Sequence, residues 1–473
     1  MEVEKTRAIV DPFWDEAILP AIARYIEIPC QSQLFDPEWK ANGHITRAVS
    51  LAAKWVAEHL PGAKIEVVEE AGRTPVLLLE VAGDGDDTVL LYGHLDKQPP
   101  MSGWDEGLGP WKPVFRDGKL YGRGGADDGY AIFAIVGAIK AIHAQGGKHG
   151  RLVALIECGE ESGSPDLAHY VNLLSDRIGT PGLVVCLDSG CGNYDQLWNT
   201  TSLRGLSAGE LKVEVLSEGI HSGSASGIVP STFRILRLLL DRLEDSSTGL
   251  LKPDWLHVKI PDHRVREAER TAEVLGQNVF GEFPFVKGAT PITNDLVELL
   301  LRRTWRPTLS VTGQSGMPNV SQAGSVLRPF TSLVLSVRLP PTLRAEHVGT
   351  RMKELLESNP PYGARVTFDV EKAAGGWEAP ATEPWLVNSL DRSSQAFFGR
   401  PACAYGEGGT IPFMGMLGEK FPKAQFVITG VLGPKSNAHG PNEFLHVQTG
   451  KNVTACVAHV IADFSAQSST PSK

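Results

Sequence analysis

The sequence predicts an α/β protein whose main domain is a mostly parallel sheet flanked by helices. Short apolar runs at 87–94, 150–158 and 182–188 are typical of buried strands. Between the first two lies 130–147, a segment of helical length that ends at glycines, as helices commonly do. Strands separated by helices form parallel sheets that are covered on both faces.

The middle of the chain has a different pattern, which predicts an inserted α+β domain. Segments 206–219 and 330–341 alternate apolar and polar residues, the period of half-exposed antiparallel strands. Patterns typical of a buried strand and a helix return near the C-terminus. A chain of 473 residues is also too long for one ordinary core. We therefore expect one discontinuous domain of residues 1–206 and 380–473, with residues 207–379 inserted as a second domain.

Composition and charge exclude several kinds of partner. The chain has 45 Lys and Arg against 55 Asp and Glu, a net charge of −10, without the basic clusters that nucleic-acid binding requires. No apolar stretch has the length of a membrane span, so we expect no membrane partner. Six cysteines without a CxxC pair, and an N-terminus unlike a signal peptide, favour a reducing, cytoplasmic location.

Ionisable residues follow each of the first three predicted strands. His94 and Asp96 end the first, Glu160 and Glu161 follow the second, and Asp188 follows the third. The carboxyl ends of parallel strands converge on one crevice. His94 and Asp96 are two residues apart, so Asp96 can brace an imidazole whose other nitrogen binds a metal. Of the adjacent glutamates, one could be a metal ligand and the other a general base.

The glycine-rich segment 120–130 contains two adjacent acids, Asp127 and Asp128. One of them could cap the helix that follows, and Asp128 is the favoured candidate. A phosphate-binding loop is disfavoured because GK[ST] and a third glycine are missing. The third interpretation places one carboxylate between two cations.

Together and in this order, these motifs resemble the M20 family of metallopeptidases, and within it the carnosinase-like (cytosolic non-specific) dipeptidases. The resemblance covers nearly the whole chain. It rests on YGHLD (92–96), GW (103–104), DGKLYGRGGADD (117–128), EESGS (160–164), CLDSG (186–190), LRG (203–205), HSG (221–223), EGG (407–409) and AHGPNE (438–443).

The resemblance implies a catalytic domain that binds two Zn²⁺ ions, with Mn²⁺ or Co²⁺ as alternatives. By similarity, Asp127 bridges the two ions. His94 and Asp188 complete one site, and Glu161 and His439 complete the other. Relatives hold the bridging aspartate in a cis peptide bond, so the resemblance also predicts a cis bond after Asp127.

The resemblance assigns further roles outside the metal ligands. Glu160 is the general base and Asp96 orients His94. His221 stabilises the oxyanion from the partner subunit, so segment 207–379 is expected to be a lid and dimerisation domain of a homodimer. Arg338 is expected to hold the substrate carboxylate together with the backbone around Gly408, Gly409 and Thr410.

Two positions depart from the family pattern. Gly129 stands where the family motif DDKG has lysine, and Gly406 stands where carnosinase-like relatives often have arginine before EGG. Neither change removes an expected metal ligand, but both bear on the substrate that is accepted.

The expected reaction is hydrolysis of an amide bond in a dipeptide or similar small substrate with a free carboxylate. An N-acyl-amino-acid amidohydrolase or a carboxypeptidase of the same family is the alternative within the enzyme interpretation. A metal-binding scaffold protein of the same fold is the non-enzymatic alternative. A serine hydrolase is disfavoured, because the G-x-S-x-G match at 205–209 opens a predicted strand instead of a helix.

Overall fold

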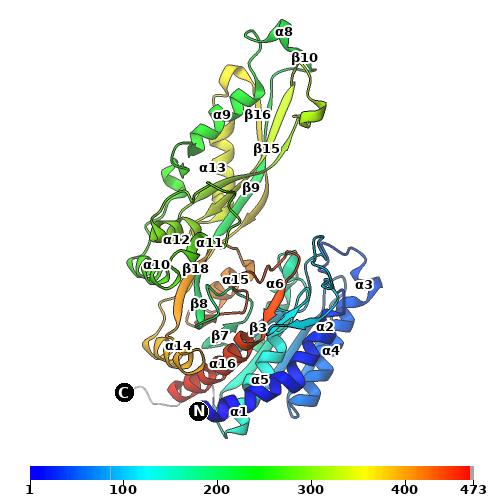
Figure 1. The fold of residues 1–473 in the computed structure, drawn as a ribbon, viewed down its shortest axis with the longest axis vertical. Coiled ribbons are helices and arrows are strands. Elements are labelled where there is room, and N and C mark those ends of the chain that lie inside the picture. Colours follow the sequence, from blue (N-terminus) through cyan, green and yellow to red (C-terminus); the bar gives the residue numbers. More distant parts are fainter. Residues whose placement is uncertain (86, 469–473) are drawn as a thin grey trace. The chain divides into compact units, whose positions relative to one another are not determined.

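The computed structural model describes residues 1–85 and 87–468, which form two compact units (Figure 1). The first unit comprises Met1–Thr201, Ala379–Tyr405 and Met416–Lys473, and the second comprises Ser202–Glu378 and Gly406–Gly415. The boundaries of the inserted segment, after Thr201 and after Glu378, lie within a few residues of those expected after 206 and 379.

Segment 406–415 groups with the second unit, although the sequence placed it in the first. Its contacts give the reason. A Cβ atom at Gly406 would lie 2.6 Å from Ser202 Oγ and 2.9 Å from Thr304 Cβ, and Arg204 donates to the Gly408 carbonyl. These partners all belong to the second unit.

A six-stranded mixed sheet forms the centre of the first unit, in the order β1-β2-β6-β3-β7-β19. Strands β6, β3, β7 and β19 pair in parallel, whereas β2 pairs antiparallel with both of its neighbours, the edge strand β1 and β6. The strands are β1 (Lys64–Val68), β2 (Val76–Val81), β3 (Thr88–His94), β6 (Arg151–Glu157), β7 (Leu183–Cys186) and β19 (Gln425–Ile428). The three predicted strands near 90, 154 and 185 are thus confirmed, with shorter ends.

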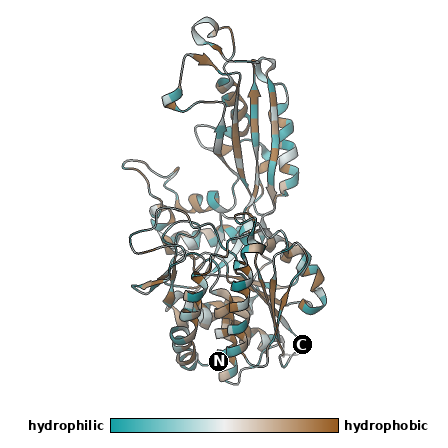
Figure 2. Ribbon diagram, turned by 90° about the vertical axis from the view of Figure 1, so that its right-hand side faces the viewer, coloured by the Kyte–Doolittle hydropathy of each residue, from teal (hydrophilic) through white to brown (hydrophobic). Residues whose placement is uncertain are grey.

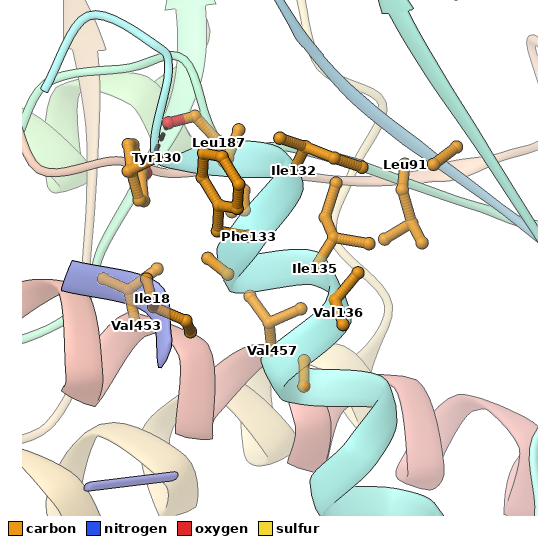
Figure 3. Close-up of a cluster of buried hydrophobic side chains, with 14 of the residues drawn as sticks. Ile18, Leu91, Tyr130, Ile132, Phe133, Ile135, Val136, Leu187, Val453 and Val457 are labelled. Carbon is orange, nitrogen blue, oxygen red and sulfur yellow. Dashed lines mark hydrogen bonds between the residues drawn. The ribbon is translucent and has the colours of Figure 1, made fainter. Parts of the chain in front are cut away.

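Helices pack against this sheet around α5 (Ala131–Ala144), the helix expected over 130–147. Nearly every residue of α5 is buried, as expected for a helix that is apolar on all sides. Helices α1 (Val3–Phe13) and α16 (Val447–Ser468) lie beside it. Figure 3 shows Phe133 and Val136 of α5 among side chains from β3 and α16. Every residue of β3 is buried, so both faces of the sheet are covered there.

The second unit is built on an antiparallel sheet in the order β13-β15-β9-β16. Its strands are β9 (Gly205–Glu214), β13 (Thr308–Ser315), β15 (Phe330–Leu339) and β16 (Arg365–Ala374). Strands β9 and β15 confirm the half-exposed antiparallel strands that the sequence predicted, and these strands carry both brown and teal segments in Figure 2. The core of this unit includes residues of α9 (Thr232–Leu243) and α13 (Ala345–Glu357).

Helix α16, at 22 residues, is the longest in the described part of the chain. In residues 1–85 and 87–468, we find no helix with both the length and the apolar character of a membrane span. All six cysteines are buried, and they lie outside any disulfide bond in the described structure.

Candidate metal centre

Five residues that the resemblance named as metal ligands come together in the first unit. His94 is the last residue of β3, Glu161 lies in a short 3-10 helix just after β6, and Asp188 follows β7. These strands are parallel neighbours, so their carboxyl ends meet at one edge of the sheet. Asp127 lies in the turn before α5, and His439 lies in the loop after β19.

The five side chains form two groups of three that share Asp127. In the first group, His94 Nε2 lies 3.5 Å from Asp127 Oδ1 and 3.7 Å from Asp188 Oδ2. In the second, His439 Nε2 lies 2.9 Å from Asp127 Oδ2 and 3.4 Å from Glu161 Oε2. The two carboxylate oxygens of Asp127 therefore face different groups, which is the geometry of a bridging ligand.

The chemistry of these groups fits divalent cations. Among the described residues, His94 Nε2 and Glu161 Oε1 are buried and have no hydrogen-bond partner. Burial raises the pKa of Glu161, and the neighbouring Asp127 carboxylate raises it further. A cation would supply the missing partner and offset the repulsion. Imidazole and carboxylate donors together suit Zn²⁺, and also Mn²⁺ and Co²⁺.

Asp96 connects the end of β3 with the glutamate pair that follows β6. Its carbonyl oxygen lies 3.1 Å and its Oδ1 atom 3.4 Å from His94 Nδ1, on the side of the ring opposite Nε2. Its carboxylate also accepts hydrogen bonds from the backbone N–H groups of Glu160 (3.1 Å) and Glu161 (3.0 Å). Asp96 can therefore orient the imidazole, as the resemblance implies, and it also holds the glutamate pair, which the sequence did not suggest.

Asp128 does not cap the following helix, so that interpretation was wrong. Helix α5 has Tyr130 as its N-cap residue and no side-chain cap. Asp128 Oδ2 instead accepts a hydrogen bond from the His94 backbone N–H (3.3 Å), and burial raises the pKa of its carboxyl. The peptide bond between Asp127 and Asp128 is cis, as the resemblance predicted.

A buried ion pair between Arg123 and Glu443 joins the loops that carry Asp127 and His439. Arg123 donates to the Glu443 carboxylate and to the Gly440 carbonyl (2.7 Å). Glu443 Oε1 also accepts from the Gly124 backbone N–H (3.0 Å) and lies 3.4 Å from the Asp127 backbone nitrogen. Both residues occur in motifs that carried the resemblance, but nothing in the sequence paired them.

The second unit gathers the residues expected to hold a substrate carboxylate. Arg338 of β15 donates to Thr410 Oγ1 (3.0 Å), and Thr410 Oγ1 donates to the Arg204 carbonyl (2.6 Å). Arg204 Nε in turn donates to the Gly408 carbonyl (3.3 Å). Gly409 is exposed between its neighbours. Arg204, from the LRG motif, is a member of this group that the sequence motifs alone did not single out.

His221 and Ser207 also lie in the second unit, in strands. His221 is exposed in β10 (Ile220–His221), which pairs with β14 (Val326–Leu327). Ser207 lies within β9, opposite Val337 of β15, and not at a turn from strand to helix. This position does not suit a nucleophilic serine.

Comparisons with known proteins identify the family of this chain. The model of peptidase family M20/M25/M40 matches residues 90–463, a span that contains all five candidate ligands. The cysteinylglycine-S-conjugate dipeptidase of Corynebacterium striatum is 26% identical over 402 residues, covering 83% of this chain and 85% of that protein. The Beta-Ala-His dipeptidase of Homo sapiens is 27% identical over 376 residues, covering 75% and 70%.

Solved structures share the fold. Human carnosine dipeptidase 1 matches with a TM-score of 0.75 at 22% identity, covering 98% of this chain and 99% of that one. The M20 family metallo-carboxypeptidase Sso-CP2 from Sulfolobus solfataricus matches with a TM-score of 0.75 at 19% identity, covering 95% and 100%. The family model matches most of the chain, and the matched span includes both groups of candidate metal ligands. This protein is therefore a metallopeptidase that belongs to peptidase family M20/M25/M40.

Proposed function

We propose that the protein is a dipeptidase that uses two metal ions to hydrolyse the peptide bond of a dipeptide or similar small substrate with a free carboxylate. The observation that carries this proposal is the position of Asp127 between two groups of candidate ligands. The names of both sequence relatives described above, which are dipeptidases, support the choice of substrate.

We assign the metals to the two groups that share Asp127. His94 and Asp188 would hold one ion, Glu161 and His439 would hold the other, and Asp127 would bind both. Zn²⁺ is the proposed metal, with Mn²⁺ or Co²⁺ as alternatives. When bound, the ions supply Lewis-acid polarisation of the scissile carbonyl and lower the pKa of the attacking water.

Glu160 is the proposed general base. Burial raises the pKa of its carboxyl, and the Asp188 carboxylate raises it further, which favours a group that both accepts and releases a proton. Glu160 takes a proton from the water as the water oxygen attacks the carbonyl carbon. It then gives that proton to the amine nitrogen as the C–N bond breaks. Asp96 holds the Glu160 backbone during this exchange.

Residues of the second unit are proposed to bind the rest of the substrate. Arg338, Thr410 and the backbone of Gly408 and Gly409 would hold the free carboxylate, a role that their mutual hydrogen bonds support. His221 would donate a hydrogen bond to the developing oxyanion of a neighbouring subunit's substrate, which makes the proposed active form a homodimer.

A substrate screen with metal control tests this function. Zinc-loaded protein is assayed against dipeptides, N-acyl amino acids and longer peptides, then again after chelation and after metal is restored. We expect dipeptide hydrolysis that is lost with the metal, recovered with it, and accompanied by two ions per chain. Turnover of N-acyl amino acids alone would indicate an amidohydrolase instead of a dipeptidase. Turnover of longer peptides alone would indicate a carboxypeptidase. Metal binding without any hydrolysis would instead support the scaffold interpretation.

A further inference from the structure

A pocket of about 340 Å³ lies in the second unit, next to the residues proposed to bind the substrate carboxylate. One part of its wall is aromatic and aliphatic, formed by Phe280, Phe283, Phe285 and Ile292. The other part contains Arg204, Arg302 and Arg303. All of these residues belong to Ser202–Glu378, so the pocket is contained in one compact unit.

Three arginines of this region lack an acidic partner among the described residues, whereas the neighbouring Arg302 pairs with Glu298 (3.0 Å). Within residues 1–85 and 87–468, none of Arg204, Arg303 and Arg338 forms an ion pair. Arg204 donates only to neutral oxygens, and Arg303 Nε is buried without a hydrogen-bond partner in the described structure. Burial lowers the pKa of Arg204 to about 10, and the positive charges of Arg338 and Arg303 add to this effect. Clustered cations without counter-charge favour an anionic ligand.

The apolar wall is open to solvent. The side chains of Phe283, Phe285 and Ile292 are 53%, 45% and 62% exposed. Large apolar side chains grouped beside a cationic site are typical of a ligand pocket, where apolar walls bind one part of the ligand and a few charged groups fix its orientation. The matching ligand therefore carries a carboxylate next to a large apolar group.

Thr410 connects the pocket to the carboxylate group. Its hydroxyl accepts from Arg338 and donates to the carbonyl of Arg204, whose guanidinium lines the pocket. A carboxylate bound near Arg338 would thus lie close to Arg204 and the pocket that Arg204 lines. We propose that the pocket binds the side chain of the substrate's C-terminal residue and selects large apolar residues, aromatic or branched aliphatic, while Arg204 and Arg303 attract the carboxylate. This inference rests on the proposed function.

Kinetics with a matched dipeptide series test the specificity. With a common N-terminal alanine, we expect kcat/KM for Ala-Phe and Ala-Leu to exceed that for Ala-Gly by roughly tenfold or more, as apolar pockets usually discriminate. Phe283→Ala should reduce this ratio by about tenfold. Because Phe283 is half exposed, the variant should fold. Phe233→Ala is the control: Phe233 lies on α9 of the same unit, is 48% exposed and is outside the pocket, so the ratio should stay unchanged.

A binding measurement by calorimetry separates this inference from the proposed function, because ligand binding requires no turnover. Metal-loaded protein is titrated with L-phenylalanine, glycine and L-phenylalaninamide. We expect phenylalanine to bind at least about tenfold more tightly than the other two, Phe283→Ala to weaken it, and Arg303→Gln to remove the difference between acid and amide.

The outcomes are distinct. Without dipeptide turnover, the proposed function fails, but phenylalanine binding that depends on Phe283 still supports the pocket. Equal kcat/KM for Ala-Phe and Ala-Gly together with equal binding of phenylalanine and glycine overturns the inference. It is also overturned if Phe283→Ala changes only the sedimentation behaviour of the protein, since the exposed wall would then be a contact between subunits.

Discussion

Glu160 and Glu161 are adjacent carboxylates in different surroundings. Glu161 Oε2 accepts a hydrogen bond from Gln98 (2.6 Å) and lies 3.4 Å from His439 Nε2, so it is held within a ligand group. Among the described residues, no hydrogen bond to the Glu160 carboxylate is found, although its backbone is held by Asp96. One carboxylate is therefore held within a candidate ligand group, whereas the other has the freedom that the proposed proton transfer requires.

Glu160→Gln tests this difference. The variant should retain two ions per chain, because Glu160 belongs to neither ligand group, and should lose about 10²–10⁴-fold in kcat, the usual contribution of a general base. Metal content by mass spectrometry and kcat are measured together. Glu161→Gln is the matched control and should lose metal as well as activity. Near-normal turnover in a metal-replete Glu160→Gln protein would reject the assignment.

The two departures from the family pattern are explained by packing. A Cβ atom at Gly129 would lie only 2.0 Å from the Tyr25 ring, so a lysine does not fit at this position. The ammonium of Lys97 is buried 4.0 Å from the centre of that ring and donates to the carbonyls of Tyr25 and Ile28. Gly406 is similarly enclosed by Ser202 and Thr304, which leaves no room for an arginine there.

At the scale of elements, the Arg123–Glu443 pair joins the turn before α5 to the loop after β19. Both side chains are almost fully buried, at 1% and 0% exposure. Removing one charge of such a pair leaves the other unpaired, which costs about 3–5 kcal/mol. The pair also holds the loops of Asp127 and His439, two candidate ligands that are far apart in the sequence.

Glu443→Gln should therefore lower the free energy of unfolding of the metal-free protein by about 3–5 kcal/mol. It should also weaken metal binding by about 10–100-fold, the usual effect of losing a group that positions ligands. Urea unfolding of the apoprotein and metal titration measure the two effects. The exposed Glu419→Gln is the control and should change neither. Unchanged metal affinity in Glu443→Gln would show that the pair does not position the ligands.

At the scale of the whole molecule, the proposed site draws on two units. The candidate metal ligands lie in the first, whereas His221 lies in the second. If His221 acts on a neighbouring subunit's substrate, His221→Ala should lose about 10²–10³-fold in kcat, the usual cost of removing an oxyanion donor. The first unit of that variant, which holds the candidate metal ligands, is unchanged.

Mixing two inactive variants tests for a shared site. A mixed dimer of Glu160→Gln and His221→Ala contains one site with an intact base and an intact partner histidine, so activity should recover after subunit exchange. Glu160→Gln mixed with Asp127→Asn is the control. Both of its changes lie in the first unit. Neither subunit then has an intact first unit, so no recovery is expected. Verified exchange without recovery in the first mixture, or a fully active monomer, contradicts the shared site.

The class of fold and three of the five candidate ligands follow from the order of amino acids in the chain. Hydrophobic periodicity is a local property, so buried strands and helices near α5, and half-exposed strands in the second unit, were predictable from short windows. A parallel sheet also brings the residues that follow its strands to one edge. His94, Glu161 and Asp188 were therefore predictable as neighbours from the strand pattern, and the pairing of β3 with β6 and β7 confirms it.

The remaining features depend on tertiary contacts. The approach of His439 to Asp127, the ion pair of Arg123 with Glu443, and the placement of segment 406–415 all join parts of the chain that are hundreds of residues apart. Local patterns carry no information on such contacts, because they depend on how complete elements pack. For that reason family resemblance, and not periodicity, selected His439 among thirteen histidines. The role of Asp128 and the pocket beside Arg204 exist only in the folded chain, where distant segments supply their partners.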